Sequence, residues 1–261
     1  MTAVLSRTAD PLAPLLDALA RMDGPAAAGL TPGVRVHSGH LGWISSTRLV
    51  SGDALPGLLD SAARRWGASP HAAAALAWKC YSYWVSLPAV LSFAVARRVP
   101  LMTPDAVAAR WSPHQPFLTA GMTHVRVAIL ASDPLAVTPT PEVLVVPDEA
   151  ALREVLRASL IDAHLTPLLD RIREHVHLGA RTLWGSLASG VAHGLSRAAD
   201  AIPGSTLDAA HDLLDLFDVD DLVTLEPAAT GAGLCVRRRT CCLAFTLPEP
   251  KVCTGCVIRH P

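Results

Sequence analysis

The chain has 261 residues, of which 51% are hydrophobic and 17% charged, so a mainly disordered protein is excluded. Its 22 Lys and Arg are balanced by 23 Asp and Glu. Because nucleic-acid binding needs an excess of cations to neutralise phosphates, this balance argues against a nucleic-acid partner.

Apolar residues recur at helical spacing in seven segments, and Asp53, Asp148 and Ser205 are plausible N-caps near the starts of three. The predicted helices span residues 11–22, 53–66, 71–97, 104–111, 148–177, 180–200 and 206–217. The predicted strands are Val34–Ser45, His124–Ala131, Glu142–Val146 and a C-terminal pair, Leu234–Arg238 and Cys241–Leu247. Strands in two clusters, without regular βα alternation, predict an α+β fold that is mainly helical with a small antiparallel sheet.

Residues Asp133–Pro147 include four prolines and are predicted to connect two parts of the chain. We therefore expect a single domain over 1–261 with two lobes, an N-terminal lobe at 1–132 and a helical lobe at 148–230. A tail at 231–261 differs from both because it is rich in Cys, Arg and Pro.

The stretch Ala72–Ala96 is the most membrane-like part of the sequence, but it contains Lys79 and Pro88. A membrane-spanning helix needs about 20 predominantly apolar residues, so we interpret the stretch as two buried helices that meet near Pro88. At most, we expect peripheral membrane contact. The first residues lack the apolar core of a secretory signal, which favours a cytoplasmic location.

Five of the six cysteines lie within the tail. Four of them form the pattern Cys241-Cys242-x10-Cys253-x2-Cys256, and Cys235 lies just upstream. In a cytosolic chain such clustering is typical of metal binding or redox chemistry. Cys80 stands apart in an apolar stretch and is predicted to be a small buried hydrophobe.

Both zinc and a [2Fe–2S] cluster accept four thiolates. Cys253-Thr-Gly-Cys256 is a knuckle in which the glycine lets both sulfurs turn toward one metal. The adjacent Cys241 and Cys242 would diverge in a regular strand, so both can ligate only if the chain bends there. A binuclear cluster spans more space than one zinc ion and accommodates the adjacent pair more easily. A zinc site, a thiol switch and inert cysteines remain the alternatives.

Cations surround this pattern: Arg237, Arg238 and Arg239 precede it, and Lys251 and Arg259 flank its second half. Positive charge near the sulfurs favours the reduced state of a cluster and raises its potential. The same side chains could dock an anionic ligand or an acidic electron donor. An ordinary solvated run of charge is the alternative.

The tail RRRTCCLAFTLPEPKVCTGC resembles the C-terminal signature of the FhuF-type ferric-siderophore reductases. The likeness covers all four cysteines at the family's spacing, and Leu183-Trp184-Gly185 resembles a shorter element of the same family. It implies that Cys241, Cys242, Cys253 and Cys256 hold a [2Fe–2S] cluster. It also implies one-electron reduction of Fe(III) in a siderophore, usually a hydroxamate, with release of Fe(II).

Cys235 lies outside the family pattern and is expected to be a packed thiol beside the ligands. Gly231-Ala-Gly233 is only a fragment of a dinucleotide fingerprint, with Val236 in place of the third glycine. Electrons are therefore expected from a separate donor, such as a ferredoxin. Two other functions are considered: an iron–sulfur sensor of redox state or iron supply, and a binding module with a structural zinc in its tail.

Overall fold

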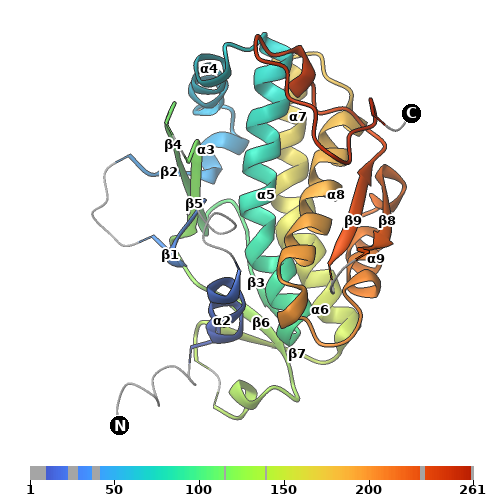
Figure 1. Ribbon diagram of the computed structural model, residues 1–261. Coiled ribbons are helices and arrows are strands. Elements are labelled where there is room, and N and C mark those ends of the chain that lie inside the picture. Colours follow the sequence, from blue (N-terminus) through green and yellow to red (C-terminus); the bar gives the residue numbers. More distant parts are fainter. Residues whose placement is uncertain are drawn as a thin grey trace.

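The computed structural model in Figure 1 describes residues 10–22, 29–36, 42–114, 116–138, 140–229 and 233–259. The predicted α+β class with mainly helical content is confirmed. The α-helices are α2 (Ala13–Arg21), α3 (Ser46–Val50), α4 (Leu55–Trp66), α5 (Pro70–Ala96), α6 (Glu149–Leu156), α7 (Thr166–His175), α8 (Ala180–Arg197) and α9 (Thr206–Leu216). The strands are β1 (Leu30–Arg35), β2 (Ile44–Ser45), β3 (Arg98–Pro100), β4 (Val107–Trp111), β5 (Leu118–Met122), β6 (Val127–Leu130), β7 (Val143–Val146), β8 (Val223–Pro227) and β9 (Leu234–Arg238).

These strands form three small sheets, with the orders β1-β5-β4-β2, β3-β6-β7 and β8-β9. Most neighbouring pairs are antiparallel, but β1 runs parallel to β5 and β6 runs parallel to β7. The first two sheets are therefore mixed rather than purely antiparallel. Strand β7 lies inside the proline-rich segment 133–147 and pairs with β6, which precedes that segment.

Helix α5 is the central element of the fold. Figure 1 shows it upright, with the sheet of β1, β5, β4 and β2 on one side and α8 on the other. It begins after Ser69, whose hydroxyl accepts a hydrogen bond from the Ala72 amide, and it continues through Pro88. The expected break at Pro88 was wrong. A proline removes one donor from the helix, and the nearly complete burial of the surrounding residues offsets that loss.

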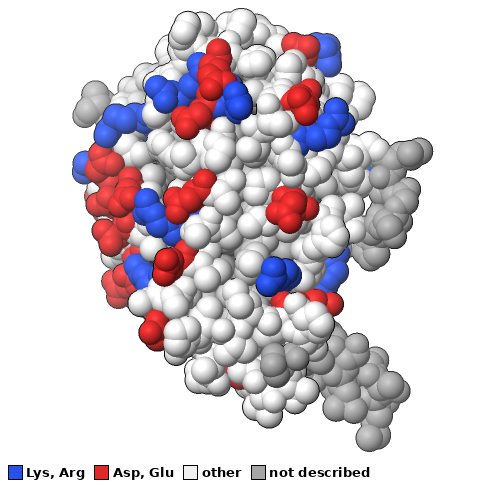
Figure 2. All heavy atoms as spheres, turned by 180° about the vertical axis from the view of Figure 1, so that it is seen from behind, with Lys and Arg blue, Asp and Glu red and all other residues white. Residues whose placement is uncertain are grey.

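The described helices include none with the combined length and apolar character needed to cross a membrane. On the face turned away from the viewer in Figure 1, positive and negative side chains lie close together in small groups (Figure 2). Two ion pairs show this intermingling next to α9, where Asp218 pairs with Arg157 and Asp221 with Arg181, each at 2.7 Å.

Helices α5 and α8 pack closely because α8 presents glycines to its neighbour. A Cβ atom at Gly194 would lie 2.8 Å from Leu87 Cδ1, and one at Gly190 would lie 3.3 Å from the Tyr83 ring. Such distances leave little room for larger side chains, so the two backbones approach each other here. This pairing forms the wall against which the C-terminal tail packs.

Two of the three predicted N-caps are confirmed. The carboxylate of Asp148 accepts a hydrogen bond from the Ala151 amide, and the Ser205 hydroxyl accepts one from the Asp208 amide. Asp53 is not a cap, because α4 begins two residues later and the Asp53 carboxylate instead accepts from the Ser51 hydroxyl. The predicted helix over 148–177 is present as α6, a π-helical segment (Arg157–Leu165) and α7.

Residues 104–111 were wrongly predicted as helix. Their second half is β4, which pairs antiparallel with β5 from Val107 opposite Met122 to Trp111 opposite Leu118. Pairing and burial override the helical preference of an alanine-rich segment. Residues 241–247 are not a strand but a bend and a short 3-10 turn, Ala244–Thr246; the partner of β9 is β8. Of the predicted strand 34–45, residues 37–41 lie outside the described residues.

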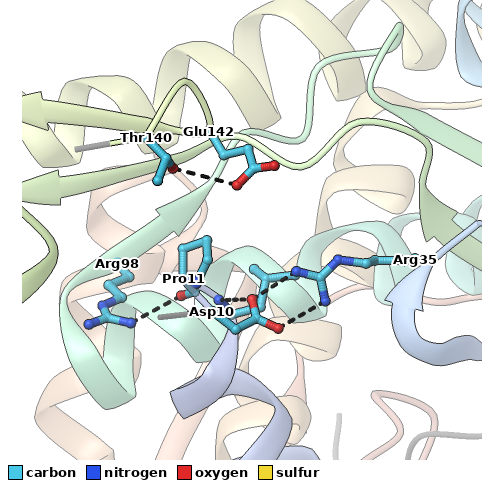
Figure 3. A network of polar contacts seen from close by, with 7 residues as sticks. Asp10, Pro11, Arg35, Arg98, Thr140 and Glu142 are labelled. Atoms are coloured by element: carbon cyan, nitrogen blue, oxygen red, sulfur yellow. Dashed lines mark hydrogen bonds and ion pairs between the residues drawn. The ribbon is translucent and has the colours of Figure 1, made fainter. Parts of the chain in front are cut away.

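A polar network fixes the first described residues to the sheets (Figure 3). Asp10 receives two hydrogen bonds from the Arg35 guanidinium, at 2.7 and 3.1 Å. Arg98 donates to the Pro11 carbonyl at 3.2 Å and forms a buried pair with Asp133 at 2.7 Å. Arginine's planar donors suit this bidentate arrangement. The network joins the start of α2 to β1 and β3.

A buried histidine behind α5 makes stability depend on pH. His164 is fully buried, with Nδ1 against the Met102 carbonyl and Nε2 2.8 Å from the Tyr81 hydroxyl. Burial lowers the pKa of His164 to about 4 from its usual 6.5. The unfolded chain therefore takes up this proton first as pH falls from 6.5 toward 4, and the free energy of unfolding decreases over that window.

We expect the free energy of unfolding to be about 2 kcal/mol lower at pH 5 than at pH 7, from about 1.4 kcal/mol per pH unit. Urea unfolding followed by circular dichroism measures the difference. The His164→Gln variant should lose only the His164 share of this dependence and keep that of His193, whose pKa is also lowered to about 4, although the variant will be less stable at pH 7. Equal dependence in both proteins would contradict the assignment.

Candidate metal centre

The tail bends sharply where the adjacent cysteines lie. Strand β9 ends at Arg238, and the Arg239 amide still bonds the Leu222 carbonyl at 3.0 Å. Beyond Cys241 and Cys242, Leu243 has a left-handed backbone with a φ of 60° and leads into the 3-10 turn. This is the departure from a regular strand that two neighbouring ligands require. In Figure 1 the red tail crosses the first turns of α5.

A small apolar cluster holds the bend against α5. Cys242, Ala244 and Leu247 of the tail are buried together with Ala72 and Leu76 of the helix. Burial of these apolar surfaces fixes the first pair of cysteines on a rigid helix rather than in a loose end of the chain.

The second pair of cysteines returns to β9. Gly255, between Cys253 and Cys256, accepts a hydrogen bond from the Arg238 amide at 2.8 Å. A Cβ atom at Gly255 would lie 2.0 Å from the Val236 carbonyl oxygen, so only glycine fits this approach. The Cys256 amide closes the turn on the Cys253 carbonyl at 3.2 Å.

All four predicted ligands occupy one neighbourhood and are free thiols. Burial raises the pKa of Cys241 and of Cys253, and the proximity of Cys242 and Cys256 raises both further. Cys242 and Cys256 are buried, whereas Cys253 is exposed. Among the described residues, no three His, Cys, Asp or Glu side chains are arranged to hold a metal ion.

The two remaining cysteines differ from expectation. Cys235 is exposed on β9, so its predicted packing was wrong; alternation along the strand turns it outward with Arg237. Cys80 on α5 is half-buried rather than fully buried as predicted, and burial raises its pKa to about 11. It also lines two cavities together with Cys253, which the sequence did not indicate.

The same alternation separates the three arginines. Arg237 and Arg239 are exposed and bond their neighbours on β8, the first to the Glu226 carboxylate at 3.4 Å and the second to the Thr224 hydroxyl at 3.1 Å. Arg238 points inward and is only 5% exposed.

Arg238 is buried without a counter-ion among the described residues. One of its terminal nitrogens donates to the Ser186 hydroxyl at 2.9 Å, while Nε and the other terminal nitrogen have no partner there. Arg238 and Cys253 line the same cavity, and the Arg238 amide bonds the carbonyl of Gly255, between Cys253 and Cys256. A buried, unpaired cation is costly. A negatively charged [2Fe–2S] tetrathiolate at these cysteines would supply the missing charge, so the unpaired charge of Arg238 suits that group.

The Leu183-Trp184-Gly185 element lies against this tail. A Cβ atom at Gly185 would lie 1.9 Å from the hydroxyl of Thr240, the residue before Cys241. The Leu183 carbonyl accepts a hydrogen bond from the Trp78 indole at 2.7 Å. The two segments on which the family resemblance rests are therefore in contact, although Gly185 and Thr240 are 55 positions apart in the sequence.

A cavity of about 440 Å³ reaches Cys253 from the side of α5 and α8. Its lining combines cations and aromatic rings from α5 and α8 with the inner face of β9 and the knuckle. The cations and rings of the lining are Lys79, Tyr83, Trp84, His193, Arg197 and Arg238. Of these, only Arg238 was given a role beside the cysteines from the sequence, because the others lie on helices far from the cysteines along the chain.

In comparisons with known proteins, neither a family model nor a curated protein matched the chain.

Proposed function

We propose that this protein reduces ferric iron held in a siderophore, using a [2Fe–2S] cluster bound by Cys241, Cys242, Cys253 and Cys256. The observation that carries the proposal is the position of Cys253. This residue belongs to the four-cysteine pattern of the tail and also lines a cavity large enough for a small ligand. The resemblance of the tail to FhuF-type reductases supports the same reaction.

A bound [2Fe–2S] cluster supplies one-electron transfer. The chain's own residues position the chelate against Cys253 and offset negative charge through Arg238. Hard oxygen chelators hold Fe(III) far more tightly than Fe(II), so one electron converts a stable complex into a labile one. No covalent step is needed.

The electron would come from a separate donor protein such as a ferredoxin. Phe245 and Ile258 are exposed on the tail, at 42% and 48%, in the same segment as Lys251 and Arg259. Exposed apolar side chains rimmed by cations suit transient docking of an acidic partner. We propose a cytoplasmic location, in keeping with six free cysteines.

The first test is an anaerobic visible spectrum before and after dithionite, with iron, sulfide and zinc assayed on the same sample. We expect visible bands that bleach on reduction and about two irons and two sulfides per chain. Release of Fe(II) from a ferric siderophore, trapped by a ferrous chelator, then tests turnover. A colourless protein with one zinc would overturn the proposal in favour of a binding module, and a cluster without turnover would favour a sensor.

Replacing individual cysteines separates ligands from bystanders. We expect Cys253→Ser to lose most of its iron and its visible bands, because serine is a poor ligand for this cluster. Cys235→Ser is the matched control from the same tail and should retain both. Loss of iron in Cys235→Ser alone would refute the proposed set of four.

A further inference from the structure

The cavity beside Cys253 is lined by three cations and no carboxylate. Lys79 comes from α5, Arg197 from α8 and Arg238 from β9, whereas no Asp or Glu side chain lines it among the described residues. Three separate elements thus bring positive charge to one cavity.

These cations lack counter-ions within the described part of the chain. Lys79 makes no hydrogen bond or ion pair there. Arg197 donates to the Tyr83 hydroxyl at 3.0 Å and lies over its ring, contacts that leave its charge unneutralised. Arg238 has two unpartnered donors. Because the charge of Arg238 is assigned to the cluster, an anion in the cavity would neutralise the charges of Lys79 and Arg197, which have no counter-ion among the described residues.

All three cations lie near the His193 side chain. Partial burial and then Arg197, Lys79 and Arg238 lower the pKa of His193, which also lines the cavity, to about 4. His193 is therefore neutral near pH 7 and can donate or accept a hydrogen bond.

Charge remains after the cluster is counted. An oxidised [2Fe–2S] tetrathiolate carries two negative charges, which offset two of the three cations. In the oxidised holoprotein, the state in which binding is measured below, the cavity therefore keeps one positive charge, and the Tyr83 and Trp84 rings, edge to face at 4.7 Å, provide a rigid apolar wall. Such a cavity attracts a bulky anion and gives no electrostatic advantage to a neutral ligand.

We propose that this cavity is the substrate site and that it selects ferric chelates of net negative charge, of the catecholate or carboxylate class, over neutral hydroxamates. The inference rests on the proposed reductase function and narrows its substrate class. It departs from the hydroxamate preference that the family resemblance implies.

The test uses redox-inert gallium complexes, because Ga(III) matches Fe(III) in charge and closely in size, so binding is measured without electron transfer. Gallium tricatecholate is compared with the neutral gallium complex of N-acetylated desferrioxamine, using the holoprotein, calorimetry and tryptophan fluorescence. We expect the anionic complex to bind at least about tenfold more tightly.

Two cavity variants and one control complete the design. Lys79→Met and Arg197→Met should each weaken gallium tricatecholate binding by roughly tenfold and leave the neutral complex unchanged. Arg181→Met removes a cation from the same helix α8, outside the cavity lining and paired with Asp221, and should bind both complexes as the unaltered protein does.

Equal affinity for the two complexes, tighter binding of the neutral one, or insensitivity to both cavity variants would overturn this inference. So would NADPH displacing gallium tricatecholate while itself binding tightly, since the cavity would then be a nucleotide site. Charge-selective binding without turnover of the iron complex would refute the reductase function but keep the anion site. Turnover of the iron complex without charge-selective binding would support the reductase function and refute the anion site.

Discussion

Arg238→Met is expected to stabilise the apoprotein against unfolding and to lower the midpoint potential of the cluster in the holoprotein. Removing a buried, unpaired charge relieves a desolvation cost, so the free energy of unfolding of the apoprotein should rise by about 1–4 kcal/mol. In the holoprotein the same change removes a buried positive charge from the cavity that Cys253 lines. The midpoint potential should then fall by roughly 60 mV, which is a tenfold change in a one-electron equilibrium.

Arg237→Met is the matched control, because it removes an exposed arginine from the adjacent position on β9. Its ion pair with Glu226 joins β9 to β8 and faces away from the thiols. We expect little change in unfolding or potential. Urea unfolding of both apoproteins and redox titration of both holoproteins give the comparison. Equal shifts in the two variants, or a less stable Arg238→Met apoprotein, would show that Arg238 does not compensate a bound negative group.

The sequence was most informative where chemistry is local. Spacing alone singled out Cys241, Cys242, Cys253 and Cys256, and the need for a bend after the adjacent pair is met by the left-handed Leu243. Two N-caps were also predictable, because a cap depends on residues only three positions apart.

The sequence was least informative where distant segments decide the structure. Nothing near Lys79 or Arg197 indicates that both line the cavity at Cys253, since that depends on how α5 packs against α8. Likewise, three consecutive arginines look equivalent until strand pairing with β8 turns Arg238 inward. Residues 104–111 became a strand rather than a helix for the same reason, because β5 offers a partner.

Gly255→Ala is expected to have the largest effect of any single methyl group added to the tail. The new Cβ would lie 2.0 Å from the Val236 carbonyl oxygen, an impossible contact with backbone, so the knuckle must move away from β9. That movement breaks the bond between the Arg238 amide and the Gly255 carbonyl and displaces Cys253 and Cys256. Overpacking of this kind costs about 1–3 kcal/mol.

Because two of the four proposed ligands move together, the Gly255→Ala holoprotein should lose most of its iron. Its far-UV spectrum should stay helical, because the buried residues of α5 and α8 belong to the main core, which includes no residue of the knuckle. Gly57→Ala in α4 is the control: its Cβ would meet Trp111 at an ordinary 3.9 Å. Replacing a helical glycine there should leave iron content unchanged and raise stability by up to about 1 kcal/mol. Iron and sulfide assays on both variants decide the matter. Full iron content in Gly255→Ala would mean that the knuckle can bind its share of the cluster without resting on β9, and the geometric basis of the proposed centre would fail.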